Sequence, residues 1–348
     1  MNCLLTRRRS FVSAVSFALA GVSSGSAFSQ GKPEKAKVGI AVASKASLEN
    51  LPLTMADRLG YFAAEGLEVD IHELGGGVRA LQSVVKGSDD VIAGAFEQTI
   101  HLQSKSQFFR AFVLLGRAPQ IAVAICTKTL PLYKSVADLK GRKIGIAMAG
   151  SMAHTVARSV LTRAGVAPQD VSFVELSSVG AAVSAVKSGQ IHAISSTEPL
   201  TNMLERGGNV RIIADTRSLI GAHELFGGPM PAACLYAPID FVQKNPKTVQ
   251  SLTNAVVHAL KWLQTASPTD LIKEVPEAYQ LGDRSLYLAA FSKVREAIAL
   301  DGLITDEGVK TALRLVGRLD PSINLEKIDL ARTFTNEFSR KSKDKFRA

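Results

Sequence analysis

The order of expected elements repeats itself in this 348-residue chain, and that repeat constrains the fold more than any other feature. Strand and helix patterns alternate over residues 37–95 and again over residues 143–195, as in a doubly wound α/β sheet. When residues 78–97 (VRALQSVVKGSDDVIAGAFE) are laid over residues 179–198 (VGAAVSAVKSGQIHAISSTE), six of twenty positions are identical. We therefore predict two similar lobes, each built on a parallel sheet.

The same shift of 101 residues aligns Thr54-Met55-Ala56 with Thr155-Val156-Ala157, and Asn50 with Ser151. Apolar alternation predicts the strands and helical spacing predicts the helices. The expected strands are 37–43, 67–74, 90–95, 143–147, 171–176, 191–195 and 232–237, and the expected helices are 53–65, 78–86, 152–164 and 179–187. Further helices are expected from Asn245-Pro246, Ser285 and Thr305, packed back on one lobe. The first lobe then comprises residues 36–122 with 237–348, and the second comprises residues 123–236.

The first 29 residues are predicted to be an export signal and not part of the fold. Arg7-Arg8-Arg9 precede a short apolar segment, and Ala27-Phe28-Ser29 gives a small-x-small cleavage pattern. Arg8-Arg9-Ser10-Phe11-Val12 is similar to the twin-arginine signal. We expect a periplasmic protein, soluble after cleavage of residues 1–29 and exported by the twin-arginine route. An ordinary signal peptide and an uncleaved N-terminus are the alternatives.

The charge of the mature chain does not favour nucleic acid as a partner. The chain holds 41 Lys and Arg against 31 Asp and Glu, a net charge of +10, and three arginines leave with the signal. Residues 340–348 carry +4 of the +7 that remains. The other basic residues are scattered and are not interleaved with aromatic residues, so the electrostatic footprint of a nucleic-acid-binding protein is missing. We expect a monomer whose soluble partner is a small molecule.

Cysteine and histidine give no support for a metal site or a cofactor. The sequence has no Cys-x-x-Cys, and its six histidines never fall at the spacing of metal ligands. Cys126 and Cys234 each lie in an apolar, strand-like run. Two buried thiols and one disulfide are both compatible with this pattern, and the buried thiols are favoured.

The candidate binding residues lie in the loops that follow the predicted strands, because ligands of open α/β sheets bind outside the carboxyl ends of the strands. These loops are small and rich in hydroxyls, with few nucleophiles or bases, which favours a binding cleft over a reaction centre. The candidates are Ser44, Ser47, Asn50, Gly76, Arg79, Phe96, Glu97, Gln98, Gly150, Ser151, His154, Ser178, Thr197 and Glu198. Some have structural alternatives: Ser151 as a helix N-cap, Phe96 as core, and Glu198 as part of a hinge.

Two motifs in this order resemble one family. They are Gly60-Tyr61-Phe62-x-x-Glu65-Gly66-Leu67 and Asp138-Leu139-Lys140-Gly141-x-Lys143-Ile144-Gly145. Together they resemble the ABC-transporter periplasmic solute-binding proteins of the nitrate, sulfonate and taurine type, from about residue 36 to at least residue 316. The resemblance implies a type II periplasmic-binding-protein fold, in which two lobes joined by crossing strands close on a small ligand and present it to an ABC permease. It implies binding at the strand-end loops, with residues that vary with the ligand.

The stretch GIAMAGSMAHT (145–155) leads from a predicted strand into a predicted helix. Free amides and the dipole at a helix start favour an anionic group, and Gly150 allows its close approach. We therefore expect an anionic ligand such as a sulfonate, a nitrate-like ion or an aromatic carboxylate, although Glu97 and Glu198 argue against a purely anionic one. We do not expect an enzyme. A thiamine-pyrimidine-type binding protein or enzyme of the same fold family, and a ligand sensor for a membrane receptor, stay open as alternatives.

Overall fold

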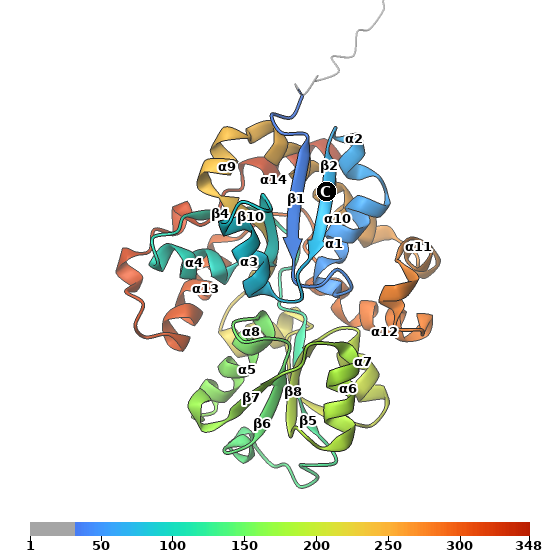
Figure 1. The fold of residues 1–348 in the computed structure, drawn as a ribbon, viewed down its shortest axis with the longest axis vertical. Coiled ribbons are helices and arrows are strands. Elements are labelled where there is room, and N and C mark those ends of the chain that lie inside the picture. Colours follow the sequence, from blue (N-terminus) through green and yellow to red (C-terminus); the bar gives the residue numbers. More distant parts are fainter. Residues whose placement is uncertain (1–31) are drawn as a thin grey trace, which may run out of the picture. The chain divides into compact units, whose positions relative to one another are not determined.

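The structure is a computed structural model that describes residues 32–348. The predicted signal peptide, residues 1–29, lies outside the described residues. Within them the strands form two five-stranded sheets, each covered by helices (Figure 1). This confirms the predicted fold class of two similar α/β lobes.

The two sheets share one strand order. The first runs β2-β1-β3-β10-β4 and the second runs β7-β6-β8-β5-β9. In each sheet the first three strands are parallel, while β10 and β5 run antiparallel to both of their neighbours. The sheets are therefore mixed and not wholly parallel as predicted. The strands are β1 (Lys37–Val42), β2 (Glu68–Glu73), β3 (Val91–Ala95), β4 (Phe109–Leu114), β5 (Ile121–Cys126), β6 (Lys143–Ile146), β7 (Ser172–Glu175), β8 (Ala193–Thr197), β9 (Val210–Asp215) and β10 (Ala233–Pro238).

The chain crosses between the lobes twice, from β4 to β5 and from β9 to β10, and the two crossing segments are hydrogen-bonded to each other. The amides of Leu115 and Gly116 donate to the Ala233 carbonyl (2.8 and 3.0 Å), and the Ala232 amide donates to the Gly116 carbonyl (2.9 Å). Strand β10 lies wholly in the first sheet, whereas the expected boundary at residues 236–237 divides it. The residue limits of the two lobes stay a prediction.

Helices pack on both sheets. In the first lobe α3 packs on β1 and β3, and in the second α5 packs on β5 and β8. The helices up to the return into the first lobe are α1 (Leu51–Arg58), α2 (Tyr61–Ala64), α3 (Gly77–Val85), α4 (Glu97–Ser104), α5 (Met152–Arg163), α6 (Val179–Ser188), α7 (Leu200–Arg206) and α8 (Leu219–Phe226). The single helix expected over residues 53–65 is wrong, because Gly60 adopts a left-handed φ of 70° and divides it into α1 and α2.

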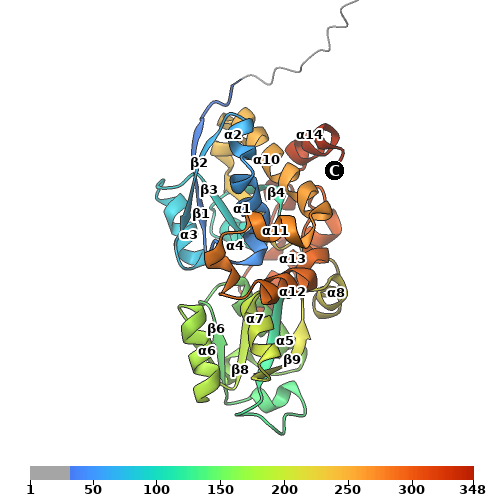
Figure 2. The same cartoon turned by 90° about the vertical axis from the view of Figure 1, so that its right-hand side faces the viewer.

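The C-terminal array is helical, as predicted. It consists of α9 (Ile239–Lys244), α10 (Pro246–Thr265), α11 (Pro268–Glu274), α12 (Arg284–Val294), α13 (Asp306–Leu319) and α14 (Glu337–Phe346). Helix α10 is buried along most of its length and packs against α1, α2 and α14 (Figure 2). Helix α12 contacts α7, and α13 contacts both α4 and α5, so this array touches helices of both lobes.

Two further sequence features have a direct structural outcome. Cys126 and Cys234 are both buried free thiols, which was the favoured alternative. None of the helices between residues 32 and 348 has the length and apolar character that a membrane span requires.

Candidate functional site

A cavity of about 90 Å³ lies at the carboxyl ends of the first sheet and is closed by the turn before α5. Most of its wall comes from the first lobe, and Gly150, Ser151 and Met152 come from the second. The first lobe contributes Ala43, Glu49, Asn50, Gly77, Val78, Leu81, Ile92, Ala93, Gly94, Ala95, Gln98, Ala233 and Tyr236. Ligand pockets commonly measure ~300–1,000 Å³. In this structure the cavity therefore accommodates a few heavy atoms or one end of a larger ligand.

The loop after β1 supplies Asn50, which is 2% exposed and is the N-cap residue of α1. Its side-chain amide donates to the Ser44 carbonyl (2.8 Å). Its amide oxygen is buried and has no hydrogen-bond partner among residues 32–348. Ser44 and Ser47 belong to the same loop but are not part of the cavity wall. Asn50 thus presents an unused acceptor at the cavity.

The start of α3 supplies a close approach between the lobes. Gly76, the N-cap residue of α3, is buried, and a Cβ atom there would collide with the side chain of Met148 from the second lobe. The clash is with the flexible end of Met148, so a larger residue at 76 would require this side chain to move, while the backbone angles of Gly76 impose no requirement for glycine. Arg79, two residues into the helix, is exposed and does not line the cavity.

Hydrogen-bonding groups of the turn before α5 are occupied by side chains of β7 and of α5 and its N-cap. The Ala149 amide donates to Glu175 (2.8 Å), and the Gly150 amide donates to Nδ1 of His154 (3.0 Å). Ser151 is the N-cap residue of α5: its hydroxyl accepts from the His154 amide (3.3 Å) and donates to the Met148 carbonyl (2.7 Å). Burial lowers the pKa of His154, which favours the neutral ring that can accept.

These contacts leave little of the anion cradle that the sequence suggested. Two amides of the turn are already occupied, one of them by the carboxylate of Glu175. Among residues 32–348, the amides of Met152 and Ala153 have no hydrogen-bond partner, as expected for the first turn of a helix. Of these two residues, Met152 lines the cavity and Ala153 follows it in the helix.

Residues 96–98 at the start of α4 take three different positions. Phe96 is fully buried and packs edge-to-face on Phe334 (centroids 6.4 Å apart), so it lies in the core and not in the cavity wall. Glu97 is 1% exposed, and neither of its carboxyl oxygens bonds to another residue of the described chain. Gln98 lines the cavity and donates to the Gly150 carbonyl (3.4 Å), which connects the two lobes.

Two carboxyl groups of the first lobe have strongly raised pKa values. Burial raises the pKa of Glu97 to about 7, and the neighbouring charge of Glu49 adds to this rise. Burial also raises the pKa of Glu49, a residue of the cavity wall, to about 7. A perturbed acid in a cavity wall, as Glu49 is, is characteristic of functional sites.

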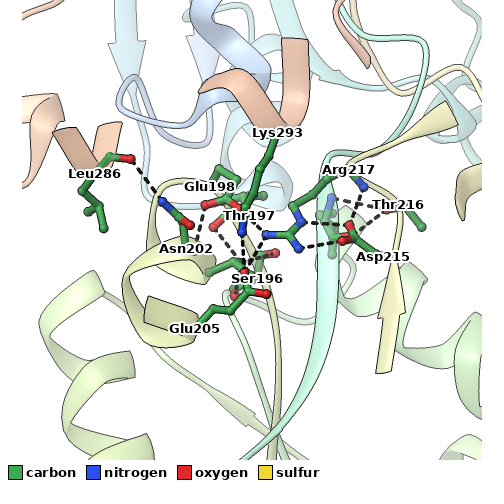
Figure 3. A network of polar contacts seen from close by, with 12 residues as sticks. Ser196, Thr197, Glu198, Asn202, Glu205, Asp215, Thr216, Arg217, Leu286 and Lys293 are labelled. Atoms are coloured by element: carbon green, nitrogen blue, oxygen red, sulfur yellow. Dashed lines mark hydrogen bonds and ion pairs between the residues drawn. The ribbon is translucent and has the colours of Figure 1, made fainter. Parts of the chain in front are cut away.

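Glu198 belongs to a network of hydrogen bonds and ion pairs with Arg217 (Figure 3), unlike its repeat mate Glu97. Arg217, whose side chain is 5% exposed, donates to Glu198 (2.6 Å) and to Asp215 (2.6 Å). The second Glu198 oxygen accepts from the Asn202 amide (2.9 Å). Burial raises the pKa of Glu198, and the Arg217 guanidinium opposes that rise. Glu198 therefore serves this network, as in the hinge alternative, and does not line the cavity.

The remaining second-lobe candidates also lie outside the cavity wall. Ser178 is exposed and caps α6 by accepting from the Ala181 amide (3.1 Å). The Thr197 carbonyl accepts from the Thr201 hydroxyl (3.1 Å). Of the fourteen predicted residues, Asn50, Gln98, Gly150 and Ser151 line the cavity. Ligand contact by the others stays a prediction.

Sequence reasoning missed two cavity residues, Glu49 and Tyr236, and the ionic partner of Glu198, which is Arg217. Glu49 directly precedes Asn50, and Tyr236 was assigned only to a strand. Arg217 has no counterpart in the repeat, because the residue 101 positions earlier is Gly116. The loop after β1 was a usable signal for Glu49, whereas nothing local points to Tyr236 or Arg217.

Two other possibilities for a site are weaker. A larger open hollow of about 430 Å³ lies over the starts of α13 and α14, between Asp306 and Lys341, away from the strand ends where ligands of this fold class bind. Within residues 32–348, no group of three or more His, Cys, Asp or Glu side chains is arranged to hold a metal ion.

Comparison with known proteins identifies relatives of the whole fold. The profile of the family described as "NMT1/THI5 like" matches residues 48–269. A protein of Bordetella bronchiseptica RB50 is 49% identical, covers 91% of this chain and 100% of its own, and superposes with a TM-score of 0.89. The putative binding protein YtlA of Bacillus subtilis (strain 168) is 22% identical over 241 residues. The match covers 66% of this chain and 66% of YtlA, which is just under two thirds of its length.

More distant solved structures share the fold. The alkanesulfonate-binding protein SsuA of Xanthomonas axonopodis pv. citri, bound to MOPS, is 17% identical (TM-score 0.65; 87% of this chain, 99% of that one). The periplasmic nitrate-binding protein NrtA of Synechocystis PCC 6803 is 15% identical (TM-score 0.68; 90% of each). The desulfurization enzyme DSZB is 14% identical (TM-score 0.62; 89% of this chain, 99% of that one). The family resemblance predicted from the sequence is confirmed.

Proposed function

Because this chain belongs to the NMT1/THI5-like family, we propose that it is a periplasmic receptor that binds one small organic ligand between its lobes and delivers it to an ABC importer. The observation that carries this proposal is the cavity whose wall combines strand-end loops of the first lobe with the turn before α5 of the second. Two adjacent connections join these lobes, so ligand contacts on both sides stabilise a closed arrangement.

The proposed ligand is polar at the end that meets the second lobe. The Met152 and Ala153 amides at the start of α5 suit a carboxylate, a sulfonate or another strong acceptor. Gly150, with a left-handed φ of 77°, keeps the approach open. The ligand therefore still carries an acidic or accepting group, as the sequence predicted, but this group meets the helix amides and not the Ser151 hydroxyl.

A receptor suits the cavity better than an enzyme. Among the described residues that line it, the ionisable side chains are Glu49 and Tyr236, and no hydroxyl or thiol there is paired with a base. Acyl or hydrolytic chemistry needs such a pair. The proposal includes export of the protein by a twin-arginine signal within residues 1–29. Delivery of the ligand to a permease is the property that distinguishes this receptor from a ligand sensor.

Native mass spectrometry of protein purified from the periplasm without denaturation tests the proposal. We expect one small molecule per chain, released chemically intact on unfolding. Gly150→Val should abolish the adduct, because its side chain enters the cavity beside Val78. Gly141→Val is the matched control: its φ of 72° imposes the same backbone strain, but nothing lies within 4 Å of its added Cβ atom. An adduct that survives Gly150→Val, or a ligand converted on incubation, contradicts the receptor.

A further inference from the structure

We infer that the first-lobe side of the cavity recognises a basic nitrogen of the ligand, an amine or amidine. The recognising groups are the carboxyl group of Glu49 and the amide oxygen of Asn50, which line the cavity, together with the carboxyl group of Glu97, which is buried next to the cavity-lining Gln98. The inference rests on the proposed receptor function and adds the chemical class of its ligand. An ammonium or amidinium group supplies N–H donors and a positive charge, which are the two features that this wall lacks.

The unsatisfied side-chain atoms of Asn50 and Glu97 are all acceptors. The side-chain oxygen of Asn50, which lines the cavity, is buried and bonds to no other residue of the described chain, and the same holds for both carboxyl oxygens of Glu97, which lies outside the wall beside Gln98. Buried polar atoms in native proteins are nearly always hydrogen-bonded, and each exception calls for an explanation. An N–H donor of the ligand satisfies the Asn50 oxygen, and its positive charge favours the ionised form of the nearby Glu97. A purely anionic ligand does neither.

The charges at the wall point the same way. Glu49 and Glu97 are close enough for the charge of Glu49 to raise the pKa of Glu97. No Lys or Arg belongs to the cavity wall among residues 32–348. A buried carboxylate without a partner is strongly unfavourable, and an adjacent like charge makes it worse. A bound cation removes both penalties, and the carboxyl groups then ionise as it binds.

The two walls together define a ligand with two unlike ends. The second lobe offers the N–H groups of Met152 and Ala153, and the first lobe offers carboxyl and amide oxygens. Gln98 and Tyr236, which also line the cavity, carry groups that both donate and accept. The ligand therefore combines a basic nitrogen with an acidic or strongly accepting group.

Matched pairs of small molecules test the inference, each differing in one group. The probes are taurine against isethionate, 4-aminobutyrate against 4-hydroxybutyrate, and benzamidine against benzamide. Each is titrated by calorimetry into ligand-free protein, into Glu97→Gln and into Glu49→Gln. Glu337→Gln serves as the control, since it removes the same charge at an exposed position paired with Lys341. Melting curves confirm that each variant is folded.

We expect at least one amine or amidine to bind more tightly than its partner compound, and to lose roughly tenfold to a hundredfold in affinity with either cavity variant but not with Glu337→Gln. Equal binding within every pair, or amine binding unaffected by Glu97→Gln, overturns the inference. Failure of all six probes also counts against it. If the natively purified protein still holds one nitrogen-free acid, the receptor function stands and only this inference fails.

Discussion

Glu97 in the first lobe and Glu198 in the second occupy equivalent positions in the repeat, yet only Glu198 has an ionic partner within residues 32–348. Both side chains are 1% exposed. Arg217 follows β9 and neutralises Glu198 (Figure 3), while Gly116 stands at the matching place after β4. One duplicated acid thus became part of a structural network, and the other was left with free acceptors beside a cavity.

A residue that is repeated in both lobes therefore need not have the same role in both. The Arg217 network also includes Glu205, which pairs with Lys293 of α12 (2.6 Å), so it fastens the second lobe to the C-terminal array. No such pair forms around Glu97 in the described chain. Stability and binding are therefore expected to depend on these two acids in opposite ways, and the following changes test that expectation.

Breaking the second-lobe network should have the largest effect. Arg217→Met leaves the buried Glu198 without its partner, and removing one member of a buried pair typically lowers the free energy of unfolding by ~3–5 kcal/mol. Denaturant unfolding at pH 7 measures the loss. Lys341→Met, which breaks an exposed pair, should change it by less than ~0.5 kcal/mol. If the two variants lowered the free energy of unfolding equally, the proposed stabilising role of Arg217 would be wrong.

Glu97→Gln should have the opposite sign in the ligand-free protein. The folded-state pKa of Glu97 is raised from 4.5 to about 7, so this carboxyl lowers stability as the pH rises through 7. No cationic group of the described chain offsets this effect, because the titratable groups that interact electrostatically with Glu97 are Glu49, Cys234 and Tyr236. The variant should be more stable at pH 8 by on the order of 3 kcal/mol, with a much smaller difference at pH 5. Melting curves at both pH values check this, and destabilisation at pH 8 would contradict it.

The repeat mates Asn50 and Ser151 should separate binding from capping, with smaller effects. Both hydrogen-bonding functions of the Ser151 hydroxyl are used within its own turn, so Ser151→Ala should lower stability by ~1 kcal/mol and leave ligand affinity unchanged. Asn50 makes no capping bond, and its oxygen faces no partner in the described chain. Asn50→Ala should therefore weaken binding more than Ser151→Ala does. The reverse order in calorimetry with the bound ligand would place the anchor at Ser151.

Local patterns predicted much of the fold, including the two lobes, most strands and the helix start at Ser151. They failed where distant segments meet. The alternation within β10 does not reveal that it enters the first sheet between β3 and β4 in antiparallel orientation. The candidate site was harder to predict for the same reason, because the partners of Glu198 and Phe96, which are Arg217 and Phe334, lie in other segments of the chain. One failure was local: the apolar spacing of a helix continues across Gly60, so the pattern did not reveal that this residue is left-handed and ends α1.

The composition of the molecule held by natively purified protein tests the central claim most directly. Accurate-mass spectrometry of the species released on unfolding should give one compound per chain that contains a basic nitrogen and an acidic or accepting group. Glu97→Gln should lose most of this compound, while Glu337→Gln keeps it. A nitrogen-free sulfonate or carboxylate, or nitrate itself, retained equally by wild type and Glu97→Gln, would contradict the account.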